Sequence, residues 1–287
     1  MAESIEQFFV NQYQNTIRVL SQQMGSRLEM TTIPPVRQTG ENLFWERMGA
    51  TAAVDLASRH DDTPNIEVDH SRRKQTATPK VWATLLDWQD VNRMIVDPTS
   101  YYNTIAVAAM NRAKDDIIID ALGGNAYSGQ TGTTAVALPS AQKIAHGSTS
   151  LTLSKLLTAK EMLDEAEVDE EMERYCVLAA NQITSLLGTT EIKSSDYNTV
   201  KALAAGQIDT FLGFKFIRSQ RLDLTASVRY CYCYAKGAIG YGILDDIQTK
   251  IDQRPDKNYA WQVYVKMDIG ATRIEEEQVI EVACSES

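Results

Sequence analysis

Two apolar, aromatic segments separated by a polar stretch constrain the fold most strongly. The first lies around Phe44-Trp45, the second runs from Val81 to Trp88, and the polar stretch between them reads SRHDDTPNIEVDHSRRKQT. This pattern predicts a long two-stranded excursion with charged residues at its tip and edges. Because a two-stranded arm is only marginally stable alone, we expect this one to rest on another surface, most simply that of a neighbouring subunit.

The first 25 residues predict an amphipathic helix. Apolar residues recur every three or four positions, and Gly25 offers a left-handed stop. Such a helix needs a partner surface, either its own or a neighbour's. Its apolar stripe consists of Ile5, Phe9, Tyr13, Ile17, Leu20 and Met24.

The remaining pattern mixes helices with strands and predicts an α+β fold. Asp97-Pro98 opens a long helix to about Leu122, and a second helix follows Thr152. We expect the long helix to pack through Tyr102, Ile105, Ala109, Ala113 and Ile117. Strands are expected at RYCVLAA, TFLGFKFIRS, RYCYCYA, WQVYVKMDIG and QVIEVAC, with Trp261, Val263, Val265, Met267 and Ile269 on one inward face.

Composition excludes several classes of protein. The net charge of −10 argues against a dedicated nucleic-acid binder, and no apolar run reaches the length of a membrane span. The one basic cluster, Arg72, Arg73 and Lys74, is expected to be a solvated loop or a patch that meets acidic protein surface. The start of the chain lacks the pattern of a signal peptide, and four cysteines form no disulfide framework at this length, so a reducing cytoplasm fits as the place of synthesis.

The stretch GGNAYSGQTGTT, from Gly123 to Thr134, nearly spells a phosphate-binding loop. A true phosphate loop joins a strand to a helix and carries a lysine, whereas this stretch follows a predicted helix and has Gln130 at the lysine position. We therefore expect a flexible Gly/Ser/Thr loop. A nucleotide-binding enzyme that uses residues 124–131 remains a disfavoured alternative.

Other chemical signals are weak. Cys231 and Cys233 share one face of a strand, where small apolar side chains commonly pack. His60 and His70 lie near Asp61, Asp62 and Asp69 and could bind a cation weakly, although a solvated loop is favoured. The acidic run from Glu161 to Glu173 is expected to be a solvated face, and calcium binding stays open although the spacing is not that of an EF-hand. We expect no catalytic, metal or cofactor-binding residue, no cofactor, and no enzyme.

Several phrases resemble those of tailed-bacteriophage major capsid proteins with the Hong Kong 97-type fold. They are NQYQNTIRVLSQQMGSRL, GFKFIRS and AKGAIGYGILDDIQTKIDQRPDKNYAWQVYVKMDIGATRIEEEQVIEVAC. The order of predicted elements agrees with this fold over nearly the whole chain. The resemblance implies an N-terminal arm (1–38), an extended β-hairpin loop (39–90), a peripheral domain (91–176) with a spine helix (97–122), an axial domain (177–238), and C-terminal strands that return to the peripheral domain (239–287).

The resemblance also implies a function. It implies a virion protein, assembled in the host cytoplasm, that forms hexamers and pentamers of an icosahedral shell around double-stranded DNA without sequence-specific contacts. Some relatives crosslink their subunits through Lys and Asn side chains, but no residue here matches that motif, so we expect a noncovalent shell. A separate scaffolding protein, a portal and a decoration protein are the candidate partners, and no membrane would be involved. An encapsulin-like compartment, which has the same fold and packages an enzyme cargo, is the alternative. The candidates for subunit contacts are Phe9, Tyr13, Ile17, Phe44, Trp45, His60, Asp61, Asp62, Arg72, Arg73 and Lys74.

Overall fold

The structure is a computed structural model that describes residues 19–55, 58–59, 62–63, 65–87, 89, 99–188 and 210–286. Most of the expected N-terminal helix lies outside these residues. The part that is described, residues 19–25, is not helical, and Leu20 is 87% exposed. The Asp97-Pro98 helix start also lies outside the described residues.

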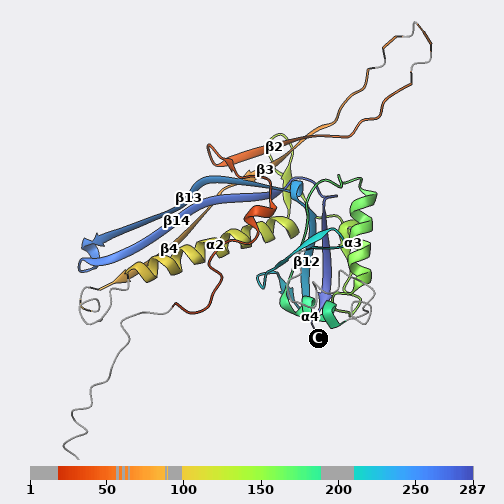
Figure 1. Ribbon diagram of the computed structural model, residues 1–287. Coiled ribbons are helices and arrows are strands. Elements are labelled where there is room, and N and C mark those ends of the chain that lie inside the picture. Colours follow the sequence, from red (N-terminus) through yellow and green to blue (C-terminus); the bar gives the residue numbers. More distant parts are fainter. Residues whose placement is uncertain are drawn as a thin grey trace, which may run out of the picture. The chain divides into compact units, whose positions relative to one another are not determined.

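Helices and runs of several strands are mixed along the chain, as expected for an α+β fold (Figure 1). The described helices are α2 (Thr99–Gly123), α3 (Leu153–Glu165) and α4 (Ala180–Gly188), with 3₁₀ turns η2 (Glu29–Thr31), η3 (Ser140–Gln142), η4 (Lys236–Ala238) and η5 (Pro255–Lys257). The strands are β1 (Val36–Arg37), β2 (Asn42–Met48), β3 (His70–Thr76), β4 (Thr78–Leu86), β5 (Ala126–Ser128), β6 (Thr134–Val136), β7 (Lys143–Ile144), β8 (Arg174–Leu178), β9 (Thr210–Phe211), β10 (Phe214–Arg218), β11 (Leu224–Thr225), β12 (Val228–Ala235), β13 (Ile239–Arg254), β14 (Ala260–Arg273) and β15 (Val279–Ser285).

The described strands form three sheets. The largest has the order β7-β15-β12-β8-β10-β9, with β11 paired to β12. The other two have the orders β1-β13-β14-β4 and β2-β3-β5-β6. Contacts group the chain into two compact units, Met1–Gly25 with Lys80–Arg112 and Ile247–Met267, and Ser26–Pro79 with Ala113–Asp246 and Asp268–Ser287.

The centre of the largest sheet is buried on both faces. Strands β8, β12 and β15 are apolar at nearly every position, and Cys176, Tyr234 and Ile280 are fully buried. Helix α3 contacts β15. Its N-cap is Thr152, whose hydroxyl oxygen accepts a hydrogen bond from the backbone N–H of Lys155. The strands expected at RYCVLAA, RYCYCYA and QVIEVAC are thereby confirmed, as is the helix after Thr152.

The long helix is confirmed, but its packed face was predicted wrongly. The residues expected to pack are only half-buried, whereas Ala106, Met110, Ile118 and Leu122 are buried. Apolar residues occur all round this helix, so the 3.6-residue period does not single out one side.

Two strand predictions need correction. TFLGFKFIRS is a hairpin, because Leu212 and Gly213 both have positive φ (54° and 85°) and reverse the chain between β9 and β10. In β14, Val263 and Met267 are buried as expected, but Trp261 is 41% exposed. The tryptophan lies next to the turn from β13, and the inward face begins two residues later.

The described residues contain no helix that is both long enough and apolar enough to cross a bilayer.

A buried lysine joins α3 to the sheet and to the loop that precedes the helix. Lys155 donates from Nζ to the carbonyls of His146 (2.9 Å), Thr149 (2.9 Å), Ser150 (3.1 Å) and Ala283 (3.0 Å). The side chain is almost fully buried, so these carbonyls replace the water around its ammonium group.

We therefore expect Lys155→Met to lower the free energy of unfolding by about 3–5 kcal/mol, because it removes the cation and leaves buried acceptors without their donor. Lys160→Met, on the same helix but half-exposed, should change it by less than about 1 kcal/mol. Urea denaturation of both variants measures the difference. Equal losses of unfolding free energy in the two variants would contradict a structural role for the hydrogen bonds of Lys155.

A surface carboxylate links three other segments. Glu173 accepts hydrogen bonds from Lys215, Tyr175 and Lys236. The bond from Lys215 contributes most to lowering the pKa of Glu173 from 4.5 to about 2, followed by the bond from Tyr175.

Since the pKa is lower in the folded state, the contribution of Glu173 to stability is present above pH 4.5 and is lost as the pH falls toward 2. We expect the wild type and Glu173→Gln to differ most in unfolding free energy above pH 4.5 and to converge near pH 2. Urea titrations at a series of pH values test this. A difference that does not change with pH would refute it.

Candidate subunit interface

The expected two-stranded excursion exists, but its second strand is not the one predicted. β2 pairs antiparallel with β3, so that Phe44 lies opposite Lys74 and Trp45 opposite Arg73. The apolar segment from Val81 instead forms β4 and joins β14 in another sheet. The basic cluster therefore belongs to the base of the excursion and not to its tip.

The base of this hairpin is seated on two glycine-containing strands. The Trp45 indole lies where a side chain on Gly240 would be, at 2.6 Å from its ideal Cβ position, and its Nε1 donates to Gln75 Oε1 at 2.9 Å. The carbonyl of Thr76 lies 2.5 Å from the ideal Cβ position of Gly270. Side chains at these two glycines would force the hairpin away from β13 and β14.

Two arginines of the hairpin converge on one glutamate. Arg73 is 4% exposed and lies 2.8 Å from Glu276 Oε1, and Arg47 lies 3.1 Å from Oε2 of the same carboxylate. Arg47 also donates to the Ile274 carbonyl at 2.9 Å. The two ion pairs fix both strands of the hairpin to the connection between β14 and β15.

The neighbouring arginine faces the other way. Arg72 forms an ion pair with Glu46 at 3.0 Å, and its guanidinium lies 5.5 Å from the centre of the Phe44 ring. The Arg72 side chain is 38% exposed and that of Glu46 62%, so the ion pair lies at the surface. The cluster Arg72-Arg73 is thus divided between a surface contact and a buried one.

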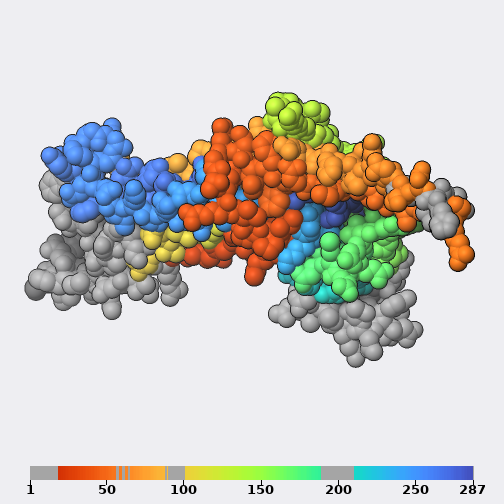
Figure 2. Space-filling view, turned by 90° about the horizontal axis from the view of Figure 1, so that it is seen from above, coloured from red at the N-terminus to blue at the C-terminus, as the bar shows by residue number. Residues whose placement is uncertain are grey.

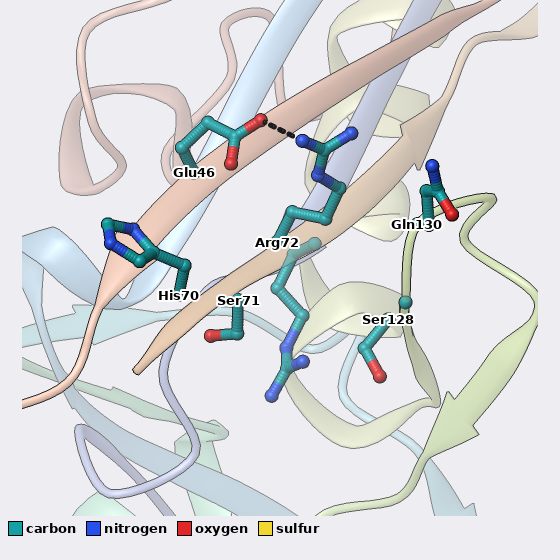
Figure 3. A pocket seen from close by; sticks show the side chains of 8 residues that line it. Glu46, His70, Ser71, Arg72, Ser128 and Gln130 are labelled. Atoms are coloured by element: carbon teal, nitrogen blue, oxygen red, sulfur yellow. Dashed lines mark ion pairs between the residues drawn. The ribbon is translucent and has the colours of Figure 1, made fainter. Parts of the chain in front are cut away.

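An open cleft lies beside Arg72 (Figure 3). Strands β2 and β3 form one wall, and the β5–β6 turn forms the other, next to the two strands in Figure 2. The labelled lining residues are Glu46, His70, Ser71, Arg72, Ser128 and Gln130. Its polar lining would suit a polar protein segment better than an apolar ligand.

We call residues 49–69, between β2 and β3, the β2–β3 loop; its described residues run out from the hairpin as an extended segment (Figure 1). Every described residue of this loop is exposed, and its two ends are joined by a hydrogen bond from Gly49 N to Asp69 O at 2.8 Å. Val54, Ile66 and Val68 expose 59%, 42% and 39% of their surface. The loop thus carries apolar side chains into solvent.

Some interface candidates lie outside the described residues. These are Phe9, Tyr13, Ile17, His60 and Asp61. Asp62 is exposed in the β2–β3 loop, while Phe44, Trp45 and Lys74 are half-buried at its base. Sequence reasoning missed Arg47 and Glu276, because residues 229 positions apart carry no local signal of their pairing.

The glycine-rich stretch is a hairpin and not the flexible loop expected. β5 and β6 pair with each other, β5 pairs with β3, and Gly129 and Gly132 turn the chain with φ of 95° and 65°. Where α2 ends and this hairpin begins, backbone carbonyl groups face a positively charged side chain. The fully buried Arg273 donates hydrogen bonds to the carbonyls of Leu122 (2.9 Å) and Gly124 (2.8 Å). A phosphate loop presents N–H groups to an anion, so this polarity is the reverse of a nucleotide site.

No group of three or more His, Cys, Asp or Glu side chains suited to a metal ion occurs among the described residues. All four cysteines are free and buried. At the end of the acidic run Glu170 and Glu171 are exposed, as expected for a solvated face.

The comparisons with known proteins agree on one class. The family model described as phage capsid protein matches residues 5–286. Among curated proteins, no sequence matches the chain.

Solved structures match over almost the full length. The capsid of the cyanophage P-SCSP1u has a TM-score of 0.79 at 15% identity and covers 99% of this chain and 95% of its own. The capsid of the native GTA particle has a TM-score of 0.72 at 14% identity, with 99% and 98% covered. Mycobacterium phage Che8 gives 0.71 at 14% identity, with 96% and 97% covered.

These likenesses extend over both compact units and over each of the three sheets, and they agree with the fold expected from the sequence. The chain therefore belongs to the phage capsid protein family and has the Hong Kong 97-type capsid fold.

Proposed function

We propose that this shell-forming capsid protein builds hexamers and pentamers of an icosahedral shell that encloses double-stranded DNA. The observation that carries the proposal is the β2–β3 loop, whose described residues are all exposed and include apolar side chains. Burial of these exposed apolar side chains against another molecule lowers the free energy of the system. In a closed shell, that other molecule is a copy of the same chain.

The expected domains are proposed to keep their roles. Residues 1–38 act as the N-terminal arm, 39–90 as the extended loop, 91–176 as the peripheral domain, 177–238 as the axial domain, and 239–287 as its returning strands. The role is structural and not enzymatic. The net charge of −10 suits a container from which DNA must be able to move, since a strongly basic lining would trap it.

Within this proposal Arg72 and Arg73 have different structural roles. Arg72, with Phe44 and the cleft beside it, contacts the neighbouring subunit, whereas Arg73 holds the hairpin base in its own subunit through Glu276. A scaffolding protein, a portal and a decoration protein are the further partners we propose, with assembly in the host cytoplasm.

The β2–β3 loop should be dispensable for folding and necessary for assembly. Replacing residues 51–67 with a four-residue turn should leave the free energy of unfolding within about 0.5 kcal/mol of the wild type, because the described residues are solvent-exposed. Closed shells should be absent in negative-stain electron microscopy and in sedimentation.

A full-length variant with serine at Val54, Ile66 and Val68 separates apolar contact from loop length. We expect fewer shells from it at equal protein concentration. Normal shells from the shortened loop would overturn the proposed role of the loop.

Arg72 and Arg73 offer a matched pair of substitutions. Arg73→Ala should lower the free energy of unfolding by about 3–5 kcal/mol, because it leaves a buried carboxylate with one partner fewer. Arg72→Ala removes an exposed ion pair, which is worth at most about 1 kcal/mol, and should instead reduce the yield of shells. Urea denaturation and particle counts distinguish the two, and equal losses of stability would contradict the division.

A further inference from the structure

Two buried cysteines face each other across neighbouring strands. Cys176 on β8 lies directly opposite Cys233 on β12 in an antiparallel pair, and their Sγ atoms are 2.8 Å apart. Both side chains are fully buried. Opposed residues in antiparallel strands have Cα atoms about 4.5 or 5.5 Å apart, and both spacings lie within the range that a disulfide spans.

The other two cysteines lack this arrangement. On β12, Cys231 is opposite Val282, so that Cys284 is its diagonal neighbour on β15. The two thiols are in hydrogen-bonding contact, but diagonal neighbours have Cα atoms about 7–8 Å apart, beyond the usual reach of a disulfide. Cys231 also shares a strand face with Cys233, which makes it a natural control.

We propose that Cys176 and Cys233 are a disulfide-forming pair that oxidises when the folded protein leaves a reducing compartment for an aerated medium. The two thiols lose two protons and two electrons as one S–S bond forms, and dissolved dioxygen takes up both protons and both electrons to become hydrogen peroxide. The geometry of the pair is independent of the proposed shell function, whereas the change of compartment rests on it.

The surroundings of the pair keep this oxidation slow. Burial raises the pKa of the Cys176 thiol well above its ordinary value, so the reactive thiolate is scarce. With both side chains inaccessible, the oxidant reaches them only when the strands open transiently. The pair can therefore stay reduced during synthesis and oxidise over the longer life of the finished protein.

The bond would close a large part of the chain into a covalent loop. The two cysteines are 57 positions apart, and the segment between them contains α4, β9, β10 and β11. This segment makes up most of the proposed axial domain, and β8 and β12 are the strands by which the chain enters and leaves it. A staple at this point would prevent the two strands from separating.

The test uses the full chain, purified under reducing conditions and then held in air-saturated buffer with a trace of copper(II) as catalyst. Denaturation in an alkylating agent, followed by non-reducing digestion and mass spectrometry, reports the state of each thiol. We expect one disulfide, between Cys176 and Cys233, with Cys231 and Cys284 alkylated. Four alkylated thiols, or a disulfide between other cysteines, would overturn the proposal.

Thermal unfolding supplies a second readout. Oxidation should raise Tm by about 5–15 °C, as closure of a loop of this length predicts, and dithiothreitol should reverse the gain. Cys176→Ala should show no gain, while Cys231→Ala should keep it. A gain that persists in Cys176→Ala would contradict the assignment.

The mass-spectrometric assignment of the four thiols uses the wild-type protein, so it does not depend on whether either variant folds. Assembly is a separate outcome: a folded chain that never forms shells but links Cys176 to Cys233 would overturn the proposed function and leave the disulfide standing.

Discussion

The end of β14 and the start of the connection to β15, residues 273–276, hold the larger compact unit together. Arg273 binds the carbonyls at the end of α2, and Glu276 binds both strands of the β2–β3 hairpin through Arg47 and Arg73. The Ile274 amide donates to the Ala238 carbonyl at 2.8 Å. Opposite charges three positions apart thus fix a helix end and a hairpin base, and buried charges of this kind are tolerated only because each is paired or hydrogen-bonded.

Sequence reasoning succeeded where one local pattern determined the structure. The apolar strands RYCVLAA and QVIEVAC, the capped helix after Thr152 and the end of α2 near Leu122 all follow from local sequence patterns. It failed where residues distant in the sequence determine which strands pair. The strand opposite Phe44-Trp45 is chosen by glycines on β13 and β14 and by Glu276, none of which lies nearby in the sequence. The turn at Leu212 gave no signal, because leucine rarely adopts positive φ.

The candidate interface was predictable only in outline. A polar segment between two apolar ones indicated an excursion, but not that Arg73 turns inward while Arg72 turns outward. Alternation along a strand places adjacent residues on opposite faces, so a basic cluster in a strand necessarily divides. The expectation of a solvated loop or a patch for this cluster contains no such division, because it does not place the residues in a strand.

The exposed β2–β3 loop also bears on how a shell of this chain would grow. An extended segment loses conformational entropy of about 1–2 kcal/mol per residue when a neighbour orders it, and this loss offsets much of what each contact gains. Pairwise association would then be weak, and only a subunit held by several neighbours at once would stay bound. Growth under these conditions starts slowly, requires a threshold concentration, and allows a misplaced subunit to dissociate before the shell closes around it.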